Sequence, residues 1–218
     1  MTLLPNTFII KFLKCCYRGF ISYFEYILER IFSNTMAKII LVTGGVRSGK
    51  SRFAEQLLQD RKQVVYVATA RCLDEEMARR IHHHQSGRPA TWTTCEASSQ
   101  LDVHLQQYPS GDVLLDCVSN MITNLMLDAQ QDYEDVPSET IEKIEKHIQH
   151  EFQLFIDACK LREGLVVIVT NEVGWCLVSP YRMGRIFSDI IGRVNQQLAD
   201  QADEVFLMVC GLPQKLKG

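Results

Sequence analysis

The sequence predicts an α/β fold: a mostly parallel, doubly wound sheet with helices on both faces. From residue 36 onward, short apolar runs rich in Val and Ile alternate with longer helical patterns, as expected when helices cover both faces of parallel strands. The first apolar run, 39–42, also passes through a glycine-rich turn directly into a helical pattern, which is the strand–loop–helix unit of such sheets. Nearly half of the 218 residues are apolar, so one sizeable core can form.

Five strands are expected where the apolar runs are near-continuous, because strands buried on both faces lack polar alternation. In chain order they span 39–43, 63–68, 112–117, 165–170 and 204–209. Helical spacing of apolar residues predicts helices at about 50–60, 73–85, 97–107, 118–127, 138–162 and 181–201. The acidic, polar segment 128–139 contains Pro137 and predicts a surface loop without chemistry.

Residues 36–218 show no internal repeat or linker and are expected to form one domain. The first 35 residues differ, because the stretch 8–20 is apolar, aromatic and basic. Its charges interrupt it too often for a transmembrane helix, and it lacks a small-residue cleavage site. We expect residues 1–35 to be an extension outside the fold, with an interfacial amphipathic helix through Ile31 as the alternative.

Composition narrows the class of ligand and the compartment. The net charge is −3 and no basic tract is present, so a small nucleotide is expected rather than a nucleic acid. The eight cysteines are scattered, without a CxxC pair or a zinc-like cluster. Buried, reduced thiols in a cytoplasmic protein are therefore expected.

The segment after the first strand is the most informative in the chain. It has the glycine–four residues–Gly-Lys-Ser pattern of a phosphate-binding P-loop, with a strand before it and a helical pattern after it. Its residues are Gly44, Gly45, Val46, Arg47, Ser48, Gly49, Lys50 and Ser51. The glycines let successive N–H groups point at one phosphate, Lys50 can reach the β- and γ-phosphates, and Ser51 can ligate Mg²⁺. The sequence therefore predicts a P-loop NTPase-type protein that handles nucleoside triphosphates.

Polar residues follow three further strands, at the edge where ligands of open α/β sheets bind. Asp116 ends the apolar run 113–115, where a carboxylate can hold Mg²⁺ directly or through water; a helix N-cap is the alternative. Thr69-Ala70-Arg71 and Thr170-Asn171-Glu172 end two other strands. The loop 171–175 is as consistent with a structural role as with a functional one. On the following helix, Arg185, Asp189 and Arg193 have the i,i+4 spacing of mutual ion pairs.

Three consecutive histidines, His82, His83 and His84, lie near the end of the helix expected at 73–85. Consecutive helical residues do not face one way, so the three cannot converge on a single metal ion. A solvated polar helix end is one interpretation. The other is that one imidazole acts as a nucleophile or an acid/base near the phosphates. Downstream, Trp92 is expected to pack, and Glu96 could meet a ribose or a metal ion, or only start a helix.

From Met36 to the C-terminus the chain resembles the family of bifunctional adenosylcobinamide kinases/adenosylcobinamide-phosphate guanylyltransferases. The resemblance rests on many separate blocks at family-like spacing: 44–55, 66–70, 74–84, 88–92, 114–117, 123–125, 170–175, 192–196, 202–205 and 211–213. One departure is Trp175-Cys176, because the family commonly has a small residue at the second position. That difference affects the expected shape of the loop and not the expected activity.

The resemblance implies two reactions of late cobalamin assembly. The hydroxyl of the aminopropanol arm of adenosylcobinamide takes the γ-phosphoryl group of ATP or GTP. GTP then transfers GMP to that phosphate through a GMP–histidine intermediate, and pyrophosphate is released. The family pattern places the nucleophile on His83, with a one-position ambiguity within the histidine run.

The resemblance also implies a set of nucleotide-binding residues, a cofactor and an assembly. Besides the P-loop, the residues expected to border the nucleotide are Thr69, Ala70, Arg71, Ser86, Gly87, Arg88 and Pro89, with Glu96 and Asp116 near ribose or metal. Mg²⁺ is the expected cofactor, held by Ser51 and Asp116, and the family implies a homotrimer. A small-molecule kinase without nucleotidyl transfer and a nucleotide-binding switch module are the competing interpretations.

Overall fold

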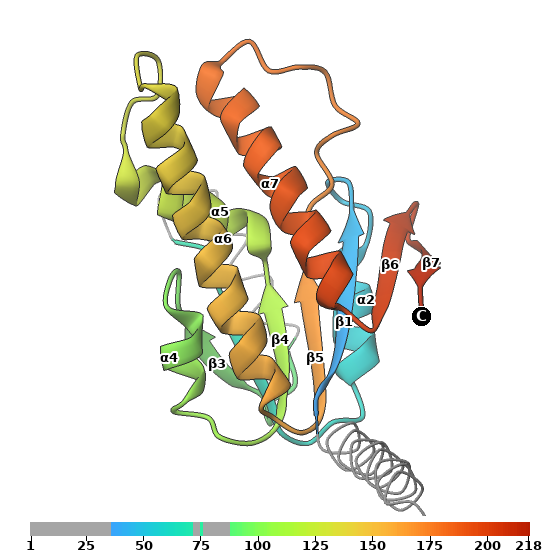
Figure 1. Ribbon diagram of the computed structural model, residues 1–218. Helices are drawn as coiled ribbons and strands as arrows, with labels where there is room; N and C mark the ends of the chain where they lie inside the picture. The colour runs from blue at the N-terminus through green and yellow to red at the C-terminus, as the bar shows by residue number, and fades with distance from the viewer. Residues whose placement is uncertain (1–35, 72–74, 76–87) are drawn as a thin grey trace, which may run out of the picture. The chain divides into compact units, whose positions relative to one another are not determined.

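The computed structural model describes residues 36–71, 75 and 88–218, and within it residues 37–218 form one compact unit. Seven strands make one sheet in the order β3-β2-β4-β5-β1-β6-β7 (Figure 1). Strands β1 to β6 run parallel to their neighbours, and only β7 pairs antiparallel, with β6. The predicted α/β class with a mostly parallel sheet is therefore confirmed.

The helices and strands follow one another as the alternating sequence pattern predicts. The strands are β1 (Lys38–Gly44), β2 (Val64–Ala68), β3 (Thr93–Glu96), β4 (Asp112–Asp116), β5 (Leu165–Val169), β6 (Glu204–Val209) and β7 (Leu212–Lys217). The helices are α2 (Lys50–Leu58), α4 (Leu101–Leu105), α5 (Val118–Ala129), α6 (Ser138–Lys160) and α7 (Arg182–Gln201). The helix expected at 73–85, apart from residue 75, and the extension expected at 1–35 lie outside the described residues.

Two hydrophobic clusters cover the two faces of the sheet. Alternate residues of each strand point to opposite faces, so Ile39 and Leu41 pack under α4, α5, α6 and α7, while Ile40 and Val42 pack under α2. Figure 1 shows α6 and α7 crossing the near face of the sheet. Trp92 is 8% exposed in the α2 cluster, so it packs as expected. Among the described helices, none combines the length and apolar character that a membrane span requires.

The parallel register sets the distance between the two functional strand ends. Val42 of β1 and Asp116 of β4 both pair with Val169, on opposite sides of β5. Two strand spacings separate their backbones, which is about 10 Å. The P-loop, which starts at the end of β1, and the carboxylate of Asp116 therefore share one edge of the sheet.

The sequence did not predict two strands, β3 and β7, which are the two edge strands of the sheet. Every residue of β7 is exposed and Pro213 interrupts its polar, charged sequence, which is tolerated because an edge strand need not donate from every N–H. Three of the four residues of β3 are exposed, so it lacks a continuous apolar run. Helix α4 is also shorter than the expected 97–107, because its first turn begins only at Leu101.

Candidate active site

The conformation of the P-loop requires glycine at two positions, because any other residue there would be strained. Gly44 has φ +149°, and a Cβ there would lie 2.6 Å from the carbonyl oxygen of Met208. Gly49 has φ +96°, and a Cβ there would lie 3.2 Å from the Cα of Gly211. Gly49 is the N-cap of α2 and provides no side-chain hydrogen bond, so it leaves the first N–H groups of that helix available to a ligand. A loop of this kind followed by a helix N-terminus is suited to bind phosphate.

Lys50 is the buried cation of the site. Its side chain is 7% exposed, and its Nζ donates a 2.7 Å hydrogen bond to the carbonyl oxygen of Gly45 inside the loop. Burial lowers the pKa of Lys50, while the negative charges of Cys117 and Asp116, when ionised, act in the opposite direction. The ammonium therefore lies in a desolvated position close to Asp116, where an anionic phosphate would stabilise its charge.

Asp116 is held by a buried tyrosine that sequence analysis did not single out. The hydroxyl of Tyr66 donates a 2.8 Å hydrogen bond to Oδ2 of Asp116, and Tyr66 is only 2% exposed. Burial raises the pKa of the Tyr66 phenol, and the carboxylate of Asp116 raises it further, so the phenol stays protonated and donates. Only its place in a strand beside β4 could have revealed this role, because a tyrosine in an apolar strand is otherwise ordinary core.

Arg88 packs against the same tyrosine. Its guanidinium carbon lies 3.3 Å from the centroid of the Tyr66 ring, a cation–π contact, and its Nη1 donates to Oγ1 of Thr94 at 3.1 Å. One residue expected to border the nucleotide thus touches the residue that orients Asp116. The neighbouring Pro89 is exposed.

Thr69 supports the backbone that follows Asp116. Its hydroxyl donates to the carbonyl oxygen of Cys117 at 2.7 Å and accepts from the N–H of Cys117 at 2.9 Å. Asn124 of α5 donates from Nδ2 to the carbonyl oxygen of Thr69 at 2.7 Å. Thr69 is 1% exposed, so its polar atoms join β2, β4 and α5 at the site rather than face solvent.

The remaining predicted residues divide between the edge of the site and its surroundings. Arg71 is engaged elsewhere: its guanidinium makes two 2.6 Å hydrogen bonds to Asp128 and also contacts Oγ of Ser98. Glu96 is exposed at the end of β3, separated from β4 by β2. The residues expected near the nucleotide that lie outside the described residues are His82, His83, His84, Ser86 and Gly87.

The loop after β5 is tied directly to the P-loop. The N–H of Glu172 donates to the carbonyl oxygen of Gly44 at 3.0 Å. Asn171 donates from Nδ2 to Oγ of Ser119 on α5 at 2.5 Å, and Asn195 of α7 donates from Nδ2 to the carbonyl oxygen of Asn171 at 3.0 Å. The polar residues Thr170 to Glu172 therefore join the P-loop, α5 and α7 at the carboxyl edge of the sheet.

The expected ion pairs within α7 are replaced by contacts with other elements. Arg193 forms a bidentate pair with Glu145 of α6. Arg185 donates to the carbonyl oxygens of Ser179 and Pro180, at 2.9 and 2.8 Å. Tertiary partners therefore provide the hydrogen bonds of these arginines, while Asp189 acts on Arg193 through its charge alone.

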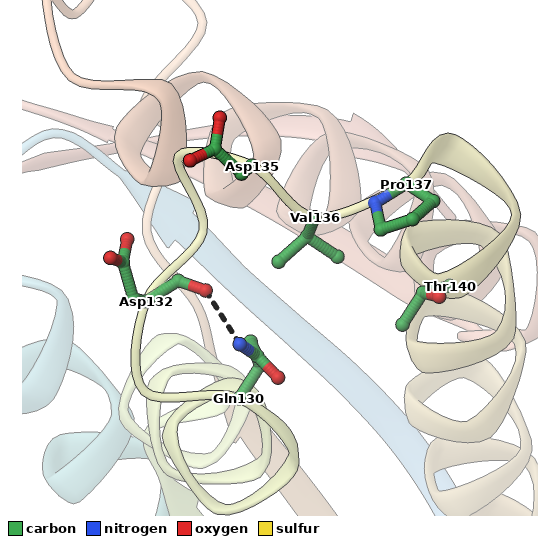
Figure 2. A pocket seen from close by; sticks show the side chains of 6 residues that line it. All are labelled: Gln130, Asp132, Asp135, Val136, Pro137 and Thr140. Carbon is green, nitrogen blue, oxygen red and sulfur yellow. Dashed lines mark hydrogen bonds between the residues drawn. The ribbon is translucent and has the colours of Figure 1, made fainter.

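A recess of about 340 Å³ lies between the end of α5 and the start of α6 (Figure 2). Its lining residues are Gln130, Asp132, Asp135, Val136, Pro137 and Thr140. None of them belongs to the predicted site. Two carboxylates and no cation among its lining residues make this recess unsuitable for a triphosphate.

Ser51 and Asp116 fit a magnesium ion that arrives with a nucleotide. Mg²⁺ at such sites keeps several waters and takes only one or two protein ligands, the rest being phosphate oxygens. Ser51 lies in the first turn of α2, and Asp116 has one carboxylate oxygen fixed by Tyr66. Among the described residues no group of three or more His, Cys, Asp or Glu could hold a metal ion alone, so phosphate oxygens would complete such a site.

Comparisons with known proteins place most of the chain in one family. A model of the family described as cobinamide kinase / cobinamide phosphate guanyltransferase matches residues 40–216. The bifunctional adenosylcobalamin biosynthesis protein CobU of Escherichia coli (strain K12) is 49% identical over 181 residues, covering 82% of this chain and 99% of that protein. The protein of the same name from Salmonella typhimurium (strain LT2) is 48% identical with the same coverage. The corresponding CobP of Pseudomonas aeruginosa (strain PAO1) is 34% identical over 183 residues, covering 82% of this chain and 96% of that protein.

Proposed function

The chain belongs to the cobinamide kinase / cobinamide phosphate guanyltransferase family, and from this premise we propose how its residues carry out both transfers. It is a bifunctional transferase of cobalamin biosynthesis. Adenosylcobinamide is phosphorylated first, with ATP or GTP as the donor, and GMP is then transferred from GTP to the new phosphate. The observation that supports the assignment best is the P-loop with buried Lys50 beside Asp116, at one edge of the sheet.

In the kinase step, the hydroxyl oxygen of the aminopropanol arm attacks the γ-phosphorus, the bond to the β-phosphate oxygen breaks, the nucleoside diphosphate leaves and the hydroxyl proton is released to solvent. The P-loop N–H groups and Lys50 bind the β- and γ-phosphates and hold the γ-phosphorus in line with the acceptor. Lys50 is buried, which lowers its pKa and leaves its charge poorly solvated before phosphate binds, so the phosphate would gain a strong, preorganised partner. Bound Mg²⁺, held by Ser51 and Asp116, would offset the charge that develops on the phosphate oxygens.

In the guanylyl transfer, His83 is the proposed nucleophile. A neutral imidazole nitrogen attacks the α-phosphorus of GTP, a P–N bond forms, and pyrophosphate leaves while the P-loop holds it. The phosphate of adenosylcobinamide phosphate then attacks the same phosphorus and releases the histidine. His82 and His84 remain the alternatives within the run. We further propose that the enzyme is cytoplasmic and acts as a homotrimer, as the family resemblance implies.

The labelling of the enzyme by GTP tests this proposal. Purified protein with Mg²⁺ and α-³²P-GTP should carry a label on a denaturing gel that is acid-labile and alkali-stable, as a P–N bond requires. His83→Ala should lose the label, whereas His104→Ala, a histidine on α4, should keep it. Label that persists in His83→Ala would move the nucleophile to His82 or His84.

The labelling experiment, combined with assays of adenosylcobinamide phosphorylation and of nucleotide binding, separates the competing functions. Wild-type protein that phosphorylates adenosylcobinamide but is never labelled would be a kinase without nucleotidyl transfer. Protein that binds nucleotide tightly and does neither would be a nucleotide-dependent switch. In each case Lys50→Ala should abolish nucleotide binding, because all three functions need the P-loop.

A further inference from the structure

The loop between β5 and α7 exposes an unusual number of large apolar side chains. Trp175 and Tyr181 are both 74% exposed, Val178 is 82% exposed and Leu177 is 98% exposed. Single exposed apolar residues need no explanation, but several within one short stretch mark a binding surface. No residue from 173 to 181 is charged. We call Trp175, Leu177, Val178 and Tyr181 the apolar loop surface.

The position of the apolar loop surface connects it to the phosphates. The loop leaves the carboxyl end of β5, between the strand that carries the P-loop and the strand that ends in Asp116. Its first residues are bound to the P-loop through the hydrogen bond from Glu172 N–H to the carbonyl oxygen of Gly44. Figure 1 shows this connection rising beyond the ends of β1 and β5 before it enters α7. The loop that carries this surface therefore starts at the same edge of the sheet as the P-loop and contacts it directly.

The backbone of the loop is held while its apolar side chains face outward. At the start, the N–H of Gly174 donates to Oε1 of Glu172 at 2.8 Å. At the end, Arg185 binds the carbonyl oxygens of Ser179 and Pro180. The chain also approaches α7 so closely that a Cβ at Gly184 would lie 2.8 Å from the Cβ of Ser179. Such fixed ends reduce the conformational entropy that a ligand would have to remove on binding.

We propose that the apolar loop surface binds the corrin macrocycle of the cobinamide substrate, with Trp175 as its main contact. This inference rests on the proposed function, which requires a corrinoid hydroxyl to reach the γ-phosphate. A corrin is a broad, flattened ring with methyl groups and neutral amides on its rim, and it presents far more apolar surface than the nucleotide. An indole and a phenol offer large apolar faces with a polar atom at one end, which suits such a ring. The loop thus selects the acceptor, and the P-loop selects the donor.

Equilibrium dialysis of adenosylcobinamide, followed by its visible absorbance, tests the proposal directly. Trp175→Ala should weaken binding about tenfold or more, since an aromatic contact plus its buried area exceeds the 1.4 kcal/mol of one decade. Trp175→Phe should stay within about threefold of wild type, because a phenyl ring retains most of the stacking surface. The matched control is Leu161→Ala, which removes a side chain that is 87% exposed at the opposite edge of the sheet and should change nothing.

Three measurements on the same variants separate the possible failures. ATP affinity should be unchanged in Trp175→Ala, and kinase activity should show a raised KM for the corrinoid with a smaller change in kcat. Light scattering should give the same oligomeric state as wild type. A Trp175→Ala protein that dissociates into smaller species and keeps its corrinoid affinity would overturn the proposal and make this surface an interface between copies. Unchanged corrinoid affinity in an intact assembly would overturn it as well. If wild-type protein neither binds nor phosphorylates adenosylcobinamide, the proposed function itself fails.

Discussion

At the scale of single residues, the site combines a buried ammonium with a nearby carboxylate that is fixed by a tyrosine. Lys50 and Asp116 lie near each other at the end of the sheet, and neither makes a direct ion pair among the described contacts. Each instead has one neutral partner, the carbonyl oxygen of Gly45 and the phenol of Tyr66. This arrangement leaves the ammonium available for phosphate and one carboxylate oxygen available for a metal ion.

Replacing Tyr66 by Phe should weaken the interaction with Mg²⁺ more than it weakens the fold. The substitution leaves the ring and its contact with Arg88, but removes the hydrogen bond that fixes Asp116. We expect the Mg²⁺ concentration for half-maximal activity to rise by roughly three- to tenfold, with the loss of about 1 kcal/mol in free energy of unfolding that one buried hydrogen bond contributes. Titration of kinase activity with Mg²⁺, alongside denaturant unfolding, measures both quantities.

Tyr133→Phe is the matched control for this prediction. Tyr133 is also 2% exposed, and its hydroxyl donates a 2.8 Å hydrogen bond, but to the carbonyl oxygen of Met126. It should lose similar stability and keep the wild-type Mg²⁺ dependence. An equal shift in both variants would show that Tyr66 acts through general stability and not through Asp116.

The lowered pKa of Lys50 predicts a pH dependence of ATP binding. Burial favours the neutral amine in the free protein, whereas bound triphosphate favours the ammonium, so binding raises the pKa of Lys50 and takes up a proton at alkaline pH. The dissociation constant should therefore rise as the pH passes through the lowered pKa, below the ordinary lysine value of about 10.4. ATP is the suitable probe, because guanine itself titrates in this range.

Lys50→Arg should abolish that slope. A guanidinium stays charged throughout the range, so ATP binding by this variant, although weaker overall, should not depend on pH in this window. Calorimetry in two buffers of different ionisation enthalpy gives the proton uptake directly. A slope that persists in Lys50→Arg would assign the titration to another group.

At the scale of elements, the contact between the P-loop and the β6–β7 hairpin limits which glycines can be replaced. A Cβ at Gly44 would meet the backbone of Met208, whereas a Cβ at Gly45 would meet nothing within 4 Å. Gly44→Ala should lower the free energy of unfolding by about 2 kcal/mol or more, because both the positive φ and the backbone contact are unfavourable. Gly45→Ala should stay within about 0.5 kcal/mol of wild type. Urea unfolding of both variants tests this, and equal stabilities would contradict it.

Elements with strong apolar patterns could be predicted from sequence, and elements at the ends of the sheet could not. The strand expected at 204–209 has the same bounds as β6. The helix expected at 138–162 ends two residues later than α6. Helix α6 has a buried face that repeats with the helical period, and β6 is a near-continuous apolar run with residues packed on both faces of the sheet. β7 has no buried residue, so nothing in its composition distinguishes it from a loop. Its pairing comes from the Cys210–Gly211 turn, where both residues have positive φ.

At the scale of the whole molecule, the site residues that sequence predicted are those tied to a motif or a strand end. The P-loop was predicted from its glycine pattern, and Asp116 was predicted because parallel strands bring their carboxyl ends to one edge. Tyr66 was not singled out, because its role depends on which strand lies beside β4, and strand order is a tertiary property. The engagement of Arg71 with Asp128 could not be foreseen for the same reason, since 57 residues separate them in the chain.

We expect residues at the carboxyl edge of the sheet to contribute mainly to ligand binding and residues at the amino edge mainly to stability. One pair of variants should separate these two contributions. At the amino edge, buried Arg162 donates to the carbonyl oxygens of Tyr108 and Gly111 and holds the α4–β4 connection against the end of α6. Arg162→Ala leaves those carbonyls unsatisfied and should lower the free energy of unfolding by about 3 kcal/mol. Its ATP affinity, measured where the protein is fully folded, should match wild type.

Lys50→Ala should show the reverse pattern. It removes a desolvated charge together with one hydrogen bond, so its free energy of unfolding should stay within about 1 kcal/mol of wild type. Its ATP affinity should nevertheless be lost, and with it the rise in melting temperature that saturating ATP gives by binding only the folded state. Thermal unfolding of both variants with and without ATP measures the contrast. If Arg162→Ala weakened ATP binding about tenfold in its folded state, the two edges would be energetically coupled, and the division of roles between them would be wrong.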